Sequence, residues 1–214
     1  MNSHLKREVV IHVKSDDEAM EILKALRRHL RSFNTYARYE RGKVRLTIYG
    51  SKDHVKVALN EIKGIHRRVK KAMYRDKDGM YQYDASLITE KSRTSVSLRD
   101  LRKILELKGH KCSIEGTSLK TDIKLEEVVY LARKYRELID KMRDVEPKII
   151  RKILCMATIT TGIDYKNLLK MAVSKGLIKY LGNNRYGLVT TPDETCKILI
   201  KEVLNSENKN SRKN

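Results

Sequence analysis

Two kinds of apolar spacing alternate along this chain, and their order constrains its fold more than any other feature. Short segments in which apolar and polar residues alternate indicate strands with one buried face, whereas apolar residues three or four positions apart indicate amphipathic helices. The region 5–73 shows these patterns in the order β-α-β-β-α. Its predicted strands are 8–13, 35–40 and 43–49.

The two helices and the last strand of this region carry clear local signals. Ser15 or Asp16 offers a side-chain oxygen to an unpaired helix N–H, and Glu18 lies three residues after Ser15, as in a capping box. In the strand 43–49, apolar residues alternate with basic and polar ones, which predicts one apolar and one basic face. The apolar residues at helical or strand spacing are Ala19, Ile22, Leu23, Leu26, Leu30, Val44, Leu46, Ile48, Val55, Leu59, Ile62, Ile65 and Val69.

The region 81–143 shows the same element order again. Strands are predicted at 81–88, 111–115 and 119–123, a helix begins after Ser95 or Ser97, and a second helix covers 125–142. Few residues match between the two regions, so this weak internal repeat rests on element order rather than on identity.

A third region begins at Glu146-Pro147, because proline suits the first turn of a helix. Asp164 caps a further helix that runs to Lys175, and Gly182-Asn183-Asn184 joins two short strands in a predicted β-hairpin. A last helix runs from Pro192 to about Leu204.

These elements predict an α+β fold with two tandem β-α-β-β-α modules and a small C-terminal module. The predicted domains are 1–75, 76–146 and 147–204, followed by a polar tail at 205–214.

The β-α-β-β-α units resemble the small α/β modules of K-homology and related ribosomal RNA-binding folds. Neither unit has a Gly-x-x-Gly loop between two helices, the loop that clamps the nucleotide backbone in that family, so no site residues are carried over from it. The segment Asp164–Ile178 and its hairpin are similar to winged-helix domains, although one helix lies between Thr161 and the hairpin where that family has two. The whole arrangement resembles an archaeal family of basic proteins without assigned function.

Positive charge is concentrated at the two ends of the chain. The protein has 47 Lys and Arg against 27 Asp and Glu, a net charge of +20. Residues 1–75 hold 19 basic and 8 acidic side chains, residues 76–146 hold 15 and 14, and residues 147–214 hold 13 and 5. This segregation favours a polyanionic partner, since each neutralised phosphate releases counterions. The high charge and the single glutamine are typical of thermophile proteins.

Basic side chains fall on several predicted elements, where arginine can act as a fork for phosphate and tyrosine can stack on bases. Tyr36, Tyr39 and Tyr49 lie among arginines on the predicted strands. The alternative is that the basic stripes are solvated faces and that the tyrosines pack at the core rim. The candidate RNA-binding residues are Lys24, Arg27, Arg28, Arg31, Arg38, Lys43, Arg45, Tyr49, Lys63, Arg67, Lys70, Lys71, Lys166, Lys170 and Arg185.

The sequence has no recognisable motif for metal binding, catalysis or phosphate binding by a glycine-rich loop. Cys112, Cys155 and Cys196 form no CxxC pair, the six histidines form no HExxH pattern, and no phosphate-binding glycine loop occurs. We therefore expect no metal, no cofactor and no catalytic residues. The sequence has no apolar signal segment after Met1 and no run long enough to span a membrane, which predicts a cytoplasmic protein.

The leading hypothesis is a non-catalytic protein that binds structured RNA, with ribosomal and transfer RNA as candidates, through its two basic modules. One alternative is a regulator that binds duplex DNA through the winged-helix-like module. Another is an assembly factor whose basic surface meets an acidic protein, ribosomal or other.

Overall fold

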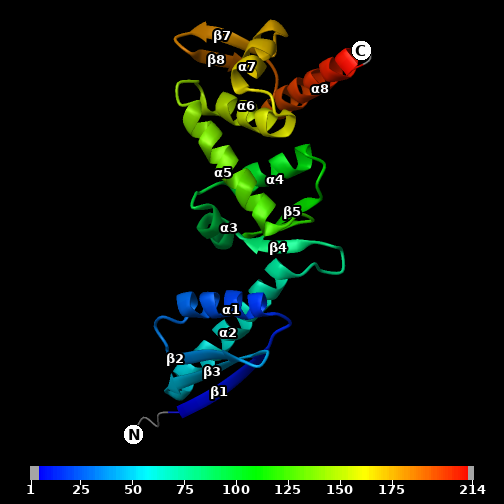
Figure 1. Ribbon diagram of the computed structural model, residues 1–214. Helices are drawn as coiled ribbons and strands as arrows, with labels where there is room; N and C mark the ends of the chain where they lie inside the picture. The colour runs from blue at the N-terminus through cyan, green and yellow to red at the C-terminus, as the bar shows by residue number, and fades with distance from the viewer. Residues whose placement is uncertain (1–4, 212–214) are drawn as a thin grey trace. The chain divides into compact units, whose positions relative to one another are not determined.

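The computed structural model describes residues 5–211, and the chain is a mixed α+β protein with small sheets (Figure 1). It divides into two compact units, with the boundary between Tyr83 and Asp84. The first unit contains β1 (Leu5–His12), α1 (Asp16–His29), β2 (Asn34–Glu40), β3 (Lys43–Gly50) and α2 (Lys52–Met73). Among the described residues, no helix is both long enough and apolar enough to cross a membrane.

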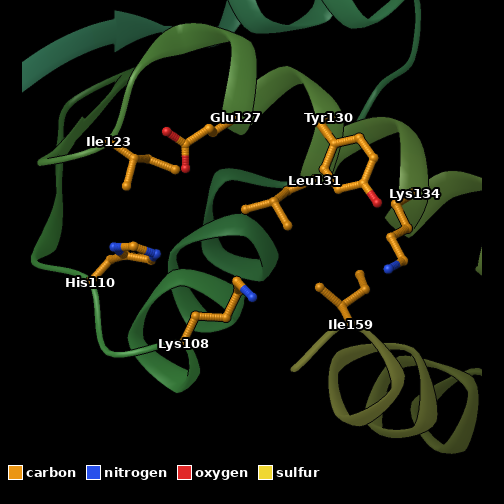
Figure 2. Close-up of a pocket in the computed structure, with 8 residues that line it drawn as sticks. All are labelled: Lys108, His110, Ile123, Glu127, Tyr130, Leu131, Lys134 and Ile159. Carbon is orange, nitrogen blue, oxygen red and sulfur yellow. The ribbon is translucent and has the colours of Figure 1, made fainter. Parts of the chain in front are cut away.

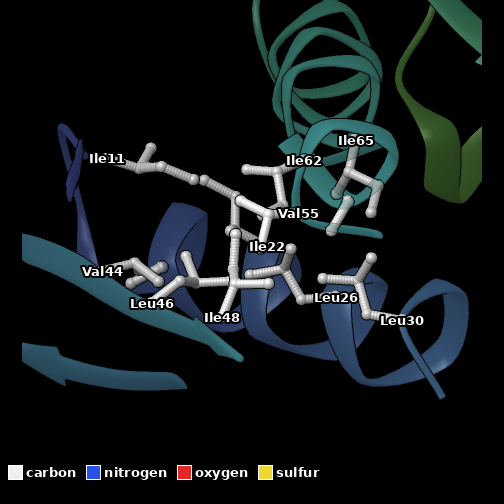
Figure 3. Close-up of a cluster of buried hydrophobic side chains, with 12 residues drawn as sticks. Ile11, Ile22, Leu26, Leu30, Val44, Leu46, Ile48, Val55, Ile62 and Ile65 are labelled. Atoms are coloured by element: carbon white, nitrogen blue, oxygen red, sulfur yellow. The ribbon is translucent and has the colours of Figure 1, made fainter. Parts of the chain in front are cut away.

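The first unit is a three-stranded antiparallel sheet with both helices on one of its faces. The strand order is β1-β3-β2, so β3 pairs with both neighbours. Val44, Leu46 and Ile48 of β3 are buried against α1 and α2, whose apolar residues recur at helical spacing. Figure 3 shows these strand residues meeting Ile22, Leu26 and Leu30 of α1 and Val55, Ile62 and Ile65 of α2.

The start of α1 confirms the predicted cap and adds a buried carboxylate to it. The Ser15 hydroxyl accepts a hydrogen bond from the Glu18 backbone N–H at 3.2 Å. The Glu18 side chain is fully buried, and its Oε2 accepts from the Lys14 backbone N–H at 2.8 Å and from the Tyr74 hydroxyl at 2.9 Å. Glu18 therefore joins the start of α1 to the residue that follows α2, and the hydrogen bonds satisfy one of its two buried oxygens.

From β4, whose last residue begins the second unit, the described chain contains two small sheets and six helices. The first sheet has the strand order β4-β6-β5, and the second is the hairpin β7-β8. The elements are β4 (Tyr81–Asp84), α3 (Ala85–Ser92), α4 (Leu98–Leu107), β5 (Cys112–Glu115), β6 (Ser118–Thr121), α5 (Leu125–Lys141), α6 (Lys148–Thr161), α7 (Tyr165–Ser174), β7 (Ile178–Gly182), β8 (Arg185–Leu188) and α8 (Pro192–Ser211).

The predicted strand 81–88 was half wrong, because it ends at Asp84 and residues 85–92 form the helix α3. The Asp84 carboxylate accepts from the Ser118 hydroxyl at 2.6 Å, and the Ala85 N–H donates to the Thr117 carbonyl. Tertiary contacts then hold the short helix. Ile88 is buried, and the Arg133 guanidinium donates to the backbone carbonyls at the end of α3.

A partly buried ion pair connects three helices of the second unit. Asp100 of α4 lies 2.9 Å from the Lys152 ammonium of α6, and the Tyr135 hydroxyl of α5 donates to the same carboxylate at 3.0 Å. Burial and the neighbouring Asp100 charge raise the pKa of Tyr135. The predicted boundary at residue 146 therefore lies inside the second unit, between elements that pack on each other.

The last helix is longer than predicted. α8 continues to Ser211 instead of ending near Leu204, so residues 205–211 of the predicted polar tail are helical. Neither glycine nor proline follows Leu204 to stop it. The hairpin is confirmed, and Asn183 and Asn184 both have the positive φ that a two-residue turn of this kind requires.

We predict that Leu46→Ala destabilises the first unit by about 2–5 kcal/mol, because a fully buried side chain leaves a cavity behind. Hydrogen exchange of the β3 amides measures the free energy of opening of this unit alone. Val10→Ala, which truncates an exposed residue of β1, is the control and should change protection by less than about 0.5 kcal/mol. Equal losses for both variants would contradict the assignment of the core.

Candidate nucleic-acid interface

The sheet face that α1 and α2 leave uncovered, called the open face below, carries four cross-strand rows of side chains. Because alternate residues of a strand point to opposite faces, the buried Val44, Leu46 and Ile48 place their neighbours on this face. The rows, in the order β1, β3, β2, are Lys6–Tyr49–Asn34, Glu8–Thr47–Tyr36, Val10–Arg45–Arg38 and His12–Lys43–Glu40.

Two exposed tyrosines lie on the open face. The side chain of Tyr36 is 63% exposed and that of Tyr49 is 42% exposed, and their strands are adjacent. Tyr39 points to the opposite face, where its hydroxyl donates to the Asp16 carboxylate, and this bond raises the pKa of Tyr39. The structure therefore places Tyr39 on the other face from Tyr36 and Tyr49. Tyr36, which was not among the predicted RNA-binding residues, is exposed on the open face.

Three predicted residues, Arg38, Lys43 and Arg45, meet on the open face. Arg38 and Arg45 are paired directly across the strands, an arrangement in which like charges repel. One carboxylate serves both, since Glu40 Oε2 lies 3.7 Å from Arg38 Nη2 and 4.0 Å from Arg45 Nε. The guanidinium pair thus keeps a positive surplus in the middle of the open face, and both tyrosines lie on one side of it, Tyr36 in the adjacent row and Tyr49 one row further.

The exposed side of α2 forms a second basic surface, the α2 stripe. It consists of Lys52, Lys56, Lys63, Arg67 and Lys70, which fall on one side of the helix and extend roughly 27 Å along its axis. Within residues 5–211, none of these five makes an ion pair with a carboxylate. Lys52 and Lys56 were not predicted from the sequence, although Lys56 lies seven residues before Lys63 and Lys52 four residues before Lys56, a spacing that continues the stripe. Lys71, which was predicted, instead donates to the Gln82 side chain at 2.7 Å.

The predicted stripe on the first helix is shorter than expected. Lys24, Arg27 and Arg28 are exposed on α1, and Lys24 pairs with Glu21 at 3.0 Å. The helix ends at His29 with Leu30 as its C-cap, so Arg31 lies in the following turn rather than on the stripe. Leu30 is buried in the core, which fixes the end of the helix there.

The basic residues predicted near the C-terminus belong to the second unit. Lys166 and Lys170 are exposed on α7, and Arg185 is the first residue of β8 beside the hairpin turn. The backbone of Glu146 forms a parallel bridge with Arg185, which adds a third segment to the hairpin. Lys175, the C-cap of α7, pairs with Glu202 of α8 at 2.8 Å.

The three cysteine side chains have the properties of packing residues rather than of reactive thiols. Burial raises the pKa of the Cys112 and Cys196 thiols to about 11, and it also raises that of Cys155. In the described range, no three His, Cys, Asp or Glu side chains gather in a way that could hold a metal ion.

Comparison with known proteins gives one match. A family model described as "Uncharacterized protein conserved in archaea (DUF2067)" matches residues 11–197, most of the chain. No curated protein and no solved structure matches the chain.

We predict slow alkylation of the native cysteines. A thiol with a pKa near 11 has roughly a hundredfold less thiolate at pH 8 than one with a pKa of 9, and only the thiolate reacts. Iodoacetamide labelling followed by mass spectrometry, with and without denaturant, measures this difference. Fast labelling of Cys112 or Cys196 in the native chain, at the rate of the denatured one, would contradict their assignment as packing residues.

Proposed function

The chain belongs to that archaeal family, and we propose that it is a cytoplasmic, non-catalytic protein that binds RNA through the first unit. The observation that carries this proposal is the open face, where Arg38 and Arg45 lie side by side and the exposed Tyr36 and Tyr49 occupy the next two rows on one side of them. An antiparallel sheet that shows arginine and tyrosine to solvent has the chemistry of a platform for unpaired bases.

Each group on the open face has a role in this proposal. Tyr36 and Tyr49 stack on bases of an unpaired segment, for which every base offers a π-face. Arg38 and Arg45 bind phosphates next to the stacked bases, and the repulsion between the two arginines falls when phosphate neutralises them. Lys43 adds a further charge at the end of the same face.

The α2 stripe supports binding to folded rather than fully extended RNA. It lies on the helix layer, away from the open face, so both surfaces can engage the same RNA where the RNA folds around the unit. Its five cations offer phosphate contacts without base readout, which position a nucleic acid but carry no sequence information. Structured RNA, with ribosomal and transfer RNA as candidates, has both unpaired loops and continuous backbone.

The proposal includes the predicted internal repeat, in which two β-α-β-β-α modules follow each other along the chain. Two sheets with the same strand order, β1-β3-β2 and β4-β6-β5, support it, whereas the inserted α3 is a departure. The likeness to K-homology modules stays a prediction. Because no Gly-x-x-Gly loop exists in this sequence, we assign binding to the open face and not to a loop between helices.

A second candidate function is binding of duplex DNA by the second unit. The exposed Lys166 and Lys170 on α7, next in the chain to a hairpin that carries Arg185, favour it. The winged-helix likeness rests on this helix and hairpin. The arrangement equally suits an acidic protein partner in an assembly role.

We predict that the double variant Arg38→Ala/Arg45→Ala lowers affinity for a stem-loop RNA about tenfold or more at 150 mM salt. Fluorescence anisotropy across a salt series should also show the slope of log K against log salt falling by roughly 1.4, as expected for two lost contacts to single-stranded phosphates. The matched control is Arg99→Ala/Arg143→Ala, which removes the same charge from exposed sites of the second unit and should leave affinity and slope unchanged.

Replacement of a stacking residue separates base contacts from charge. Tyr36→Ala should weaken binding to the loop RNA by about 1–3 kcal/mol but leave binding to a fully paired duplex unchanged, because only unpaired bases reach the ring. Equal effects of the open-face double variant and its control, or tight binding to duplex DNA that only Lys166→Ala and Lys170→Ala abolish, would overturn the RNA proposal. No binding to any nucleic acid would favour the acidic protein partner.

A further inference from the structure

A pocket in the second unit combines apolar, aromatic and charged groups in one place. It encloses about 330 Å³ and lies between the end of α4, the segment around Ile123, and the helices α5 and α6. This volume falls at the lower end of the range for sites that hold a small molecule. Three buried residues, Ile123, Leu131 and Ile159, supply its apolar part.

The polar side chains around the pocket come from both of its sides. Lys108 follows α4, whereas Glu127, Tyr130 and Lys134 lie on successive turns of α5. Figure 2 shows the ammonium groups of Lys108 and Lys134 directed into the space between these elements. Two cations thus approach one small volume in a segment of the chain whose net charge is close to zero.

Tyr130 and Lys134 form a preassembled pair at the pocket. The Lys134 Nζ lies 5.8 Å from the centre of the Tyr130 ring, and the tyrosine side chain is 59% exposed. An exposed ring beside buried leucine and isoleucine side chains is suited to stack on a planar group. His110 Nδ1 lies 3.5 Å from Asp122 Oδ1, which leaves its other ring nitrogen, Nε2, available to a ligand.

We infer that this pocket binds a nucleoside monophosphate, either free or as the 5′-phosphorylated end of an RNA chain. The base packs on Tyr130 and the apolar residues, and the phosphomonoester takes the ammonium groups of Lys108 and Lys134. The Glu127 carboxylate accepts hydrogen bonds from ribose hydroxyls, which a purely anionic ligand would not offer. The inference goes beyond the proposed function, since all of these residues belong to the second unit and free nucleotides test it without RNA.

The composition of the pocket favours this ligand over simpler ones. Inorganic phosphate would use the lysines but not the tyrosine, the apolar residues or Glu127. A nucleoside without phosphate would leave two ammonium groups without an anion. A ligand with both parts uses the whole lining, and two lysines suit a phosphomonoester, which carries more charge than an internal phosphodiester.

Isothermal titration calorimetry of the full chain tests the inference with AMP, UMP, adenosine and inorganic phosphate. We expect AMP and UMP to bind at least tenfold more tightly than adenosine or phosphate. Lys134→Ala, Lys108→Ala and Tyr130→Ala should each lower the affinity about tenfold, while Lys141→Ala, an exposed lysine of the same helix outside the pocket, should not. Thermal unfolding of each variant verifies that it is folded, and Lys108→Ala is the safest of them because Lys108 is exposed.

Two further arms identify the source of the nucleotide. A 5′-phosphorylated dinucleotide and its 5′-hydroxyl form are titrated alongside the free nucleotides. Binding of the phosphorylated dinucleotide but not of AMP would assign the pocket to RNA ends, and binding of both would assign it to the nucleotide group itself.

Three outcomes would overturn the inference. They are no heat from any phosphorylated nucleotide at millimolar concentration, phosphate binding as tight as AMP binding, and equal losses for Lys134→Ala and Lys141→Ala. The Arg38→Ala/Arg45→Ala variant should retain nucleotide binding, so failure here is distinguishable from failure of the proposed RNA interface.

Discussion

The middle strand of the first sheet buries one of its two faces, and the rest of the unit depends on that asymmetry. Val44, Leu46 and Ile48 hold β3 against α1 and α2, so the pleat directs Lys43, Arg45 and Tyr49 to the opposite side. A shift of one residue in the pairing of β3 would place arginine in the core and isoleucine in solvent, which is why the register is strongly specified. The open face is therefore a direct consequence of the packing of the core.

The second unit depends on a polar contact as well as on apolar packing. Asp100, Lys152 and Tyr135 join α4, α5 and α6 through one carboxylate, and removing Asp100 would leave both the Lys152 ammonium and the Tyr135 hydroxyl without this partner. The same three helices bound the pocket between α4 and α5, with Ile159 of α6 in its lining. The contact thus joins the three helices whose residues line the pocket.

Much of the fold could be predicted from the sequence because its signals are local. The strand at 43–49, the cap at Ser15 and the turn at Asn183-Asn184 depend on spacing and side-chain chemistry within a few residues. The helix α3 could not, since contacts of Asp84 and Arg133 with distant residues decide it. Likewise the pairing of Arg38 with Arg45 requires the register, and the pocket requires packing between separate helices. The separation of Tyr39 from Tyr36, by contrast, follows from their odd spacing on one strand and could have been read from the sequence.

Contact between RNA and the open face of the first unit can be measured directly by ultraviolet cross-linking in cells, followed by mass spectrometry of the nucleotide-modified peptides. If RNA binds there, we expect the modified residues to concentrate on β2 and β3, with Tyr36 and Tyr49 among them. Cross-links found only in the second unit, or no RNA recovered above background, would contradict it.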